Sequence, residues 1–522
     1  MSMTGAAVLV AGCGGGGGGP APMPPVPAPP PQPPTPPPGA VFGAEQVAFL
    51  LSLEQGIAQF FWNMGATPWT GSAAGPARGS ASGLIADKAD AGTGLPHGGG
   101  AASIVGTGFG LAALCIVASR LGTAQELRLI RGDGSQVSAG DLRDRVYATL
   151  SAIAQCAGAS GNGLYYHYVD SASGQATGSG DIVSTGDNAL LQAGIMVARQ
   201  FYASDPAIHA LASRLMGAAN WSWMMNGNSA YELGWSAGGG FSGHLWGAYS
   251  AVILPLLLGL GSPDAGHRIA ANPRPSAPDA RYPWDAILRP VYTCGSYPHN
   301  ANANYSFAGC PAVSYIGCPA PLFAHQYPQA FFRLQGRRDA YADYFQNSAL
   351  ATQACQAWCV ASANQLGFVD SQSGQPYVSS TLWGLTASSS NVGGVPTYEV
   401  WGGPPASWPA NSDPWDGTLV PCAAGGSLPF MPQACVQALQ NMRAQYPLSW
   451  PQFQSGPYQG QSYGFVDAFN PAARPQWYSS QYLSIDMGIT LLMAENALSG
   501  FVWNLFMGNP EAGSAMQAAG LA

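Results

Sequence analysis

Residues 108–116 read GFGLAALCI, and the stretch continues through Val-Ala-Ser to Arg120. An uninterrupted apolar run of this length predicts a buried helix. Residues Glu45–Met64 carry apolar side chains at helical spacing, and Asp205-Pro206 is a typical helix start with an N-cap followed by proline. The pattern predicts helices at Glu45–Met64, Gly108–Arg120, from Ser138 past Ile153, Asp187–Phe201, Ala207–Met216, Trp246–Leu260, Asp339–Ala361, Pro432–Gln445 and Ile485–Met507.

The composition excludes several classes of protein. Only 8% of the 522 residues are charged, the net charge is −8 and Lys88 is the one lysine, so no basic stripe exists for nucleic acid. The longest apolar run, Ala251–Leu260, contains Pro255 and is too short to span a membrane. Heptads and alternating strand pairs with Asn-Gly turns are missing. We therefore expect an all-α fold, a helical toroid rather than a bundle, over residues 41–522.

The N-terminal residues predict export. Leu9-Val10-Ala11-Gly12-Cys13 follows an apolar stretch and fits a lipoprotein cleavage site with Cys13 lipidated, although no Lys or Arg precedes it; a start placed too late would explain that gap. Residues 14–40 are rich in Gly and Pro and predict an extended tether. We expect residues 1–13 to be a lipoprotein signal and the protein to be a periplasmic lipoprotein, anchored to the outer membrane only through lipid.

Export permits disulfides among the nine remaining cysteines. Cys294, Cys310 and Cys318 could supply one bridge, and Cys422 and Cys435 could close another. No pair has the C-x-x-C spacing of a zinc site, so we expect neither a metal nor a cofactor.

Glu232 is the most informative of only seven glutamates. It lies among Trp221, Trp223 and Trp235, and indole rings stack on sugars. A carboxyl group surrounded by aromatic side chains is expected to have a raised pKa, which suits a general acid. The alternative is a loop glutamate paired with an arginine.

Asp187 and Asp486 each stand where a polar turn enters a helix, so each is either a functional acid or an N-cap. His325-Gln326-Tyr327 begins a predicted helix and presents three hydrogen-bonding side chains, which we interpret as substrate contacts. The sequence has no G-x-S-x-G elbow, P-loop, dinucleotide fingerprint or H-E-x-x-H helix. Paired carboxylates with aromatic subsites then favour glycoside hydrolysis.

Ordered blocks across residues 41–522 resemble the bacterial glucoamylase-like domain, which is similar to the endo-β-1,2-glucanases of glycoside hydrolase family 144. Among the blocks are Gly108–Ile116, Gly163–His167, Ser184–Leu191, Trp246–Ser250, His325–Tyr327, Trp383–Ala387, Asp416–Thr418 and Ile485–Gly488. The resemblance implies an (α/α)6 barrel with a cleft for β-1,2-glucan and inverting endo-hydrolysis without a metal.

Two positions depart from the family pattern. The family has glutamates where this chain has Ile182 and Ala251, and neither of these side chains can move a proton. Asp187 and Asp486 match family aspartates. We assign Asp486 to the base side and Glu232 or Asp181 to the proton donor.

The aromatic and polar side chains of the blocks and Trp-rich loops are the expected substrate contacts: Trp221, Trp223, Trp235, Trp246, Tyr249, His325, Gln326, Tyr327, Trp383 and Trp401. The leading hypothesis is a monomeric glycoside hydrolase acting on β-1,2-glucan. The alternatives are a non-catalytic glucan-binding lipoprotein on the same barrel, for which Ile182 and Ala251 argue, and a β-1,2-glucan transglycosylase.

Overall fold

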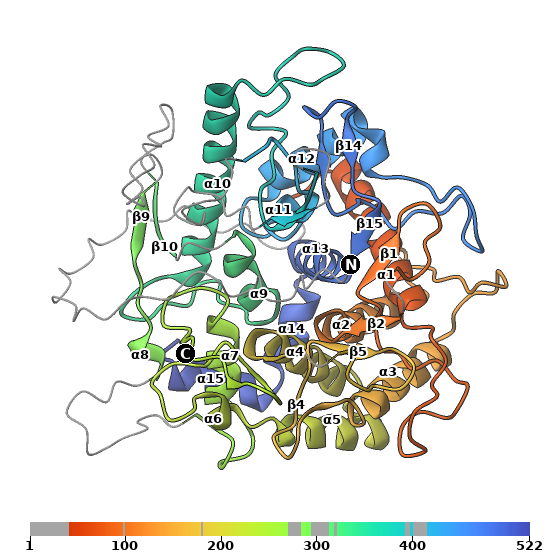
Figure 1. Ribbon diagram of the computed structural model, residues 1–522, viewed down its shortest axis with the longest axis vertical. Coiled ribbons are helices and arrows are strands. Elements are labelled where there is room, and N and C mark those ends of the chain that lie inside the picture. Colours follow the sequence, from red (N-terminus) through yellow and green to blue (C-terminus); the bar gives the residue numbers. More distant parts are fainter. Residues whose placement is uncertain are drawn as a thin grey trace.

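A computed structural model describes residues 41–97, 100–178, 181–269, 283–293, 313–317, 321–391, 397–399 and 415–521. Cys13, the tether, Trp401 and the cysteines at 294, 310 and 318 lie outside the described residues. Helices are the main regular structure of the described residues, and the strands have only two or three residues each (Figure 1), which confirms the predicted helical fold class. The helices are α1 (Ala44–Met64), α2 (Ile104–Arg120), α3 (Ala139–Ile153), α4 (Thr185–Phe201), α5 (Pro206–Ala218), α6 (Trp221–Met224), α7 (Ile253–Leu260), α8 (Pro283–Ala286), α9 (Phe323–Phe331), α10 (Tyr344–Leu366), α11 (Pro421–Gly425), α12 (Pro432–Gln445), α13 (Ser484–Leu498), α14 (Phe501–Met507) and α15 (Pro510–Ala518).

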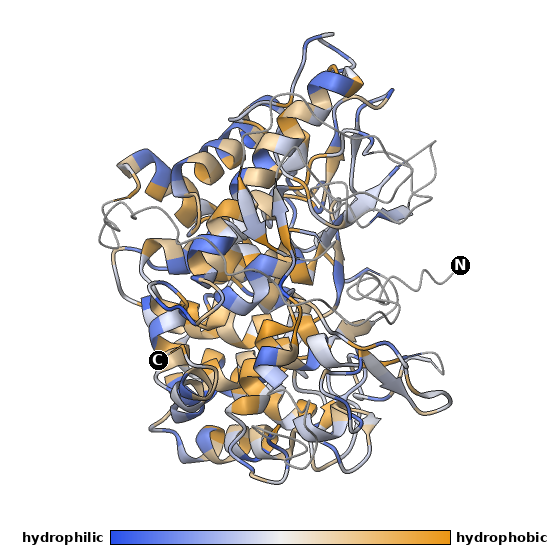
Figure 2. Ribbon diagram, turned by 90° about the vertical axis from the view of Figure 1, so that its left-hand side faces the viewer, coloured by the Kyte–Doolittle hydropathy of each residue, from blue (hydrophilic) through white to orange (hydrophobic). Residues whose placement is uncertain are grey.

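Short antiparallel strands connect the helices and lie mostly to one side of the helical body (Figure 2). The pairs are β1 (Lys88–Asp90) with β15 (Gln481–Leu483), β2 (Ala101–Ser103) with β5 (Tyr168–Asp170), β3 (Gly158–Ala159) with β4 (Leu164–Tyr165), β9 (Val291–Thr293) with β10 (Ser314–Ile316), β11 (Ser388–Ser390) with β12 (Thr397–Glu399), and β13 (Phe469–Asn470) with β14 (Trp477–Tyr478). In the one three-stranded sheet of the described chain, β7 (Gly234–Ser236) lies between β6 (Val183–Ser184) and β8 (Gly240–Phe241).

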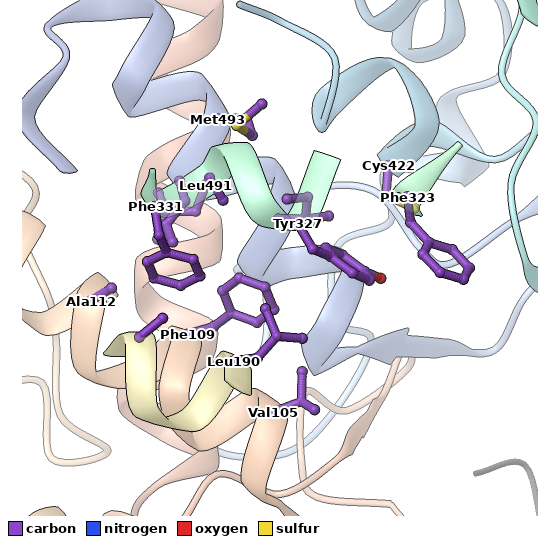
Figure 3. Packing of buried hydrophobic residues seen from close by; sticks show 14 of the residues in the cluster. Val105, Phe109, Ala112, Leu190, Phe323, Tyr327, Phe331, Cys422, Leu491 and Met493 are labelled. Carbon is purple, nitrogen blue, oxygen red and sulfur yellow. The ribbon is translucent and has the colours of Figure 1, made fainter. Parts of the chain in front are cut away.

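An inner set of helices packs around the centre of the molecule (Figure 1). Helix α2 contacts α4 and α13, α4 contacts α7, α7 contacts α9, and α9 and α11 contact α13. Helices α1, α3, α5, α10 and α12 lie farther out, each against an inner helix. Phe109, Leu190, Tyr327 and Leu491 of four inner helices converge on one packed centre (Figure 3).

Glycines allow the closest of these helix contacts. A Cβ added to Gly194 of α4 would lie 2.0 Å from the carbonyl oxygen of Gly108 in α2. A Cβ on Gly488 of α13 would lie 2.1 Å from the ring of Phe109. Larger side chains at these positions would push the inner helices apart.

Several predicted boundaries are wrong for local reasons. Residues 246–252 are not helical, because Tyr249 donates its backbone N–H to Leu288 and only Ile253–Leu260 form α7. The predicted helix Ile485–Met507 is two helices, because Gly500 has a left-handed backbone (φ 69°). Helix α10 begins at Tyr344, where Asp343 caps it, rather than at Asp339. Within the described chain no single helix is long and apolar enough to cross a membrane; α13 and α14 meet that criterion only together and are bent by 94°.

The bridge expected between Cys422 and Cys435 is also wrong, since both are free thiols. Cys422 is in α11 and Cys435 in α12, and both are buried.

Candidate active site

Asp187 and Asp486 occupy equivalent places at the starts of two inner helices. Strand β6 leads directly into α4 and strand β15 into α13, and each aspartate is the third residue of its helix. Asp187 is not an N-cap: Ser184 Oγ caps α4 by accepting from the Asp187 backbone N–H at 3.3 Å. Both carboxyl groups are buried. Their side chains are therefore available for contacts beyond their own helices.

The Asp187 carboxylate hydrogen-bonds to His167. Oδ2 contacts His167 Nδ1, whereas Oδ1 is buried without a donor. Burial lowers the pKa of His167, but the charge and hydrogen bond of Asp187 outweigh burial, and the pKa is raised above its usual value. The two side chains therefore form a buried hydrogen-bonded pair, and Asp187 favours the protonated form of His167.

Asp87 and Tyr168 lie next to this pair. The Tyr168 ring packs edge-on against the His167 ring at 4.0 Å between centroids, and its hydroxyl lies 3.4 Å from Asp87 Oδ2. Burial raises the pKa of Asp87, opposed by the charges of Lys88 and His167. Asp181 is close enough for its charge to raise the pKa of His167, and its own carboxylate accepts hydrogen bonds from Thr177 and Gly178.

Asp486 and Asp467 form a second pair of groups, in direct contact with each other. Each has one buried oxygen without another donor, Asp486 Oδ2 and Asp467 Oδ1. Cys422 Sγ donates to Asp486 Oδ1 at 3.2 Å, and the backbone N–H of Ser389 donates to Asp467 Oδ2 at 2.9 Å.

Burial and the neighbouring Asp467 raise the pKa of Asp486 well above its usual value. Burial also raises the pKa of Asp467, but the hydrogen bonds from Ser389 oppose this. Two carboxylates in contact disfavour each other's ionisation, and the pKa of Asp486 is the more strongly raised of the two.

Tyr327 lies within electrostatic range of both Asp187 and Asp486. It stacks on Phe323 at 5.1 Å between ring centroids, and Figure 3 shows it between α4 and α11. Burial raises the pKa of Tyr327 well above its usual value, with added contributions from the charges of Asp486 and Asp187. The charge of Asp87 likewise acts on both Asp486 and His167. Asp87, Asp187 and Asp486 therefore belong to one electrostatic site.

Glu232 makes its side-chain hydrogen bonds with a different set of residues. Its buried carboxylate accepts from Asn226 at 3.2 Å, Asn228 at 3.5 Å and Ser242 at 3.2 Å. These neutral donors, rather than the arginine we had considered, are its partners. The Glu232 backbone contacts the start of α4, where its carbonyl accepts from Thr185 Oγ1 at 2.6 Å.

The predicted sugar contacts divide by burial. Trp223 and Trp235 are half-buried and pack together at 5.5 Å between ring centroids, with Phe241 beside them. The remaining described members are buried: Trp221, Trp246, Tyr249, His325, Gln326, Tyr327 and Trp383.

Three of the buried residues illustrate the contacts of this group. Trp383 is wholly enclosed in the core. The Gln326 amide donates to the Ala423 carbonyl at 2.9 Å and to Ser427 Oγ at 2.8 Å, which ties α9 to α11. Burial lowers the pKa of His325 to about 3, so it is neutral. His325 also does not begin its helix, because α9 starts at Phe323.

The two departures from the family pattern lie in different surroundings. Ile182 is half-buried and its carbonyl accepts from the His167 backbone N–H at 2.8 Å, and Ala251 is buried just before α7. Among the described ranges, no cluster of three or more His, Cys, Asp or Glu side chains could hold a metal ion.

Sequence reasoning did not assign Asp87, His167, Tyr168 or Asp467 to the site. The signal available was weak: His167 ends one of the blocks, and Asp467 precedes a phenylalanine-asparagine pair in another. Strands β1, β5 and β15 bring these residues together, and their pairing partners cannot be identified from single short segments.

Comparison with known proteins places the chain among glucoamylase-like proteins. It is 24% identical over 379 residues to the exo β-1,2-glucooligosaccharide sophorohydrolase (non-reducing end) of Parabacteroides distasonis. The match covers 68% of this chain and 46% of that relative. The chain therefore spans less than half the length of that curated relative.

Solved structures share the fold. An endo-β-1,2-glucanase from Chitinophaga pinensis, in complex with sophorotriose and glucose, superposes with a TM-score of 0.65 at 22% identity, covering 91% of this chain and 98% of that one. A β-1,2-glucanase from Parabacteroides distasonis gives a TM-score of 0.66 at 20% identity, covering 91% of this chain and 60% of that one. A family model described as "Putative glucoamylase" matches residues 243–510, slightly more than half of the chain. The chain therefore belongs to the putative glucoamylase family.

Proposed function

We propose that the protein is a glycoside hydrolase that cleaves β-1,2-glucan internally. The observation that carries the proposal is the buried Asp467–Asp486 pair, in which the pKa of Asp486 is raised well above its usual value, in the same electrostatic site as Asp187 and Asp87. The relatives named as β-1,2-glucan hydrolases support the substrate class.

We also infer that the inner and outer helices form an (α/α)6 barrel. Helices α2, α4, α7, α9, α11 and α13 would be the inner ring, and the contacts between them support this arrangement. In such a barrel the starts of α4 and α13 open onto the same end, which is where Asp187 and Asp486 lie.

In the proposed reaction Asp486 is the general acid. Its proton moves to the glycosidic oxygen as the bond from that oxygen to the anomeric carbon breaks, while a water attacks the opposite face of the sugar. The raised pKa of Asp486 favours this role over the base role that the sequence suggested. Asp467 cannot be the opposing base, because inverting enzymes keep their two carboxyl groups about 6.5–9.5 Å apart and these two are in contact.

Asp187 or Asp87 is then the carboxylate that receives the water's proton. Asp187 has a free buried oxygen, and Asp87 is half-buried with the Tyr168 hydroxyl beside it. We assign Trp223 and Trp235 to sugar stacking, since they are the described tryptophans of the predicted set that keep an accessible face. Glu232 and Asp181, the donors that the sequence suggested, are the alternative acids.

The test is incubation with linear β-1,2-glucan, beside β-1,3-, β-1,4- and α-glucans, followed by product analysis by chain length and anomeric configuration. We expect β-1,2-linked oligosaccharides with inverted configuration from the wild type. D486N should lower kcat by about 10²–10⁴-fold. D144N, which changes an exposed aspartate on α3, should leave kcat unchanged. Glucan binding by calorimetry without any product would favour the non-catalytic binder that Ile182 and Ala251 suggest, and products longer than the substrate would favour a transglycosylase.

We further propose that Cys13 carries a lipid that anchors the protein in the cell envelope. The residues before it support this, because small residues precede the cysteine and a Gly/Pro-rich segment follows. Expression in a bacterium with labelled palmitate should label the wild type and not C13A. Equal labelling of both would contradict the anchor.

A further inference from the structure

Cys422 contacts the proposed acid but has no part in the reaction described above. It is the second residue of α11, it is buried, and its sulfur lies 3.2 Å from Asp486 Oδ1. Burial and the neighbouring Asp486 raise the pKa of this thiol well above its usual value. It therefore stays an S–H group and donates to the carboxyl.

Packing alone does not fix the orientation of the Asp486 carboxyl group. A cavity of about 20 Å³, large enough for one water, borders Cys422, Asp467 and Asp486. Within the described part of the chain, the thiol is the donor to Oδ1, and Oδ2 is buried with no donor, while the carboxyl group contacts Asp467. Rotation of the carboxyl into the cavity is thus opposed by two contacts, one of them the thiol.

We propose that Cys422 is a positioning residue whose S–H group orients Asp486, so that Oδ2 carries the proton given to the substrate. This inference rests on the proposed function, in which Asp486 is the acid. When the proton leaves Oδ2 for the glycosidic oxygen, Asp486 becomes a carboxylate. Hydrogen bonds to an ionised acceptor are the stronger ones, so the thiol bond strengthens as the proton departs, and the thiol keeps its own proton.

Several titratable groups face Asp486 and set the pH at which it acts. They are Cys422 on α11, Tyr327 on α9, Tyr398 on β12, Asp87 beside β1, and Asp467 with Lys88 near it. Glu54 of α1 and Arg120 of α2 instead contact each other and Glu495, in the last turn of α13. Of the near groups, the thiol bond lowers the pKa of Asp486 and the Asp467 charge raises it.

These opposite influences give opposite predictions. A general acid works while protonated, so activity falls as pH rises through its pKa. C422A removes a donor to the carboxylate, so the fall in activity on the alkaline side of the pH profile (the alkaline limb) should move to higher pH. D467N removes the neighbouring negative charge and should move it to lower pH.

The experiment measures kcat and KM for linear β-1,2-glucan across pH. C422A should lose about tenfold in kcat, the worth of one hydrogen bond, with KM nearly unchanged. C422S, which keeps a donor, should recover most of kcat and the wild-type limb. C435A is the matched control, since Cys435 is another buried free thiol, on α12, whose pKa responds to Cys355 rather than to the carboxyl pair. A C422A enzyme with wild-type kcat and pH profile would overturn the proposal.

Infrared spectroscopy gives a readout that does not depend on turnover. The S–H stretching band lost in C422A belongs to Cys422, and we expect it to shift in D486N but not in D144N. An S–H band at the same frequency in D486N and in the wild type would overturn the thiol–carboxyl contact. A wild type inactive on every glucan would overturn the proposed function, and the positioning role with it, while the infrared result would still decide whether the thiol bonds to Asp486.

Discussion

The chemistry of the candidate site depends on single residues whose partners lie far away in the chain. His167 pairs with Asp187, and Cys422 donates to Asp486 across 64 positions of sequence. Each carboxyl group is buried, so its protonation follows from one or two neighbours rather than from solvent. Substitutions of those neighbours should therefore change the pH behaviour without changing the fold.

The His167–Asp187 pair predicts a pH-dependent contribution to stability. The folded-state pKa of His167 lies above the unfolded value of about 6.5. Its stabilisation is therefore fully present below pH ~6.5 and is lost as pH rises through the raised pKa. We expect D187N to lower the free energy of unfolding more at pH 6 than at pH 9, measured by urea denaturation. An equal loss at both pH values would show that His167 is neutral in the folded protein.

At the scale of helices, close packing of the inner set depends on glycine. Gly194 faces the carbonyl of Gly108 where α4 and α2 meet, and no larger residue fits there. The start of α4 carries Asp187, so a shift of this helix would also displace the site.

Substitution of Gly194 by alanine should cost about 1–3 kcal/mol of unfolding free energy or more, because the new methyl group would meet backbone. Gly217→Ala, in α5 with open space around it, should instead stabilise by about 0.5–1 kcal/mol. Thermal unfolding of the two variants checks this. Similar effects in both would mean that the α2–α4 contact is loose.

Local patterns predicted the helices well and their ends less well. The cap at Asp205-Pro206 starts α5 as expected, because it acts within its own turn. The segment from Trp246 to Val252 is apolar at helical spacing, yet its backbone bonds to Leu288, a partner that no local pattern reveals. The same limit applies to the site. The sequence identified Asp187 and Asp486 at helix starts, whereas Asp87 and His167 are brought to the site by the pairing of the strands that follow them.

At the scale of the whole molecule, the first and last parts of the described chain are joined in the core. Arg120 of α2 binds Glu54 of α1 at 2.8 Å and also contacts Glu495 of α13. The Arg120 side chain is 8% exposed and Glu54 is fully buried. Removal of the arginine would leave two acids buried without a cation.

We expect Arg120→Met to lower the free energy of unfolding by about 3–5 kcal/mol. Arg128→Met is the matched control, because the Arg128 side chain is 69% exposed and pairs with Glu126 at the surface. Arg128→Met should lower the free energy of unfolding by only about 0–1 kcal/mol. Chemical denaturation at pH 7 measures both, and a small loss for the Arg120 variant would mean that the two glutamates are already neutral.

The most direct test of the proposed mechanism is a crystal structure of D486N with a bound β-1,2-glucan oligosaccharide. We predict that a glycosidic oxygen lies within hydrogen-bond distance of the side chain at position 486. On the other face of the same sugar, the carboxylate of Asp187 or Asp87 should lie about 6.5–9.5 Å away, with room for one water. A saccharide bound elsewhere, or one with no carboxyl group of this site near its glycosidic oxygen, would contradict the proposed mechanism.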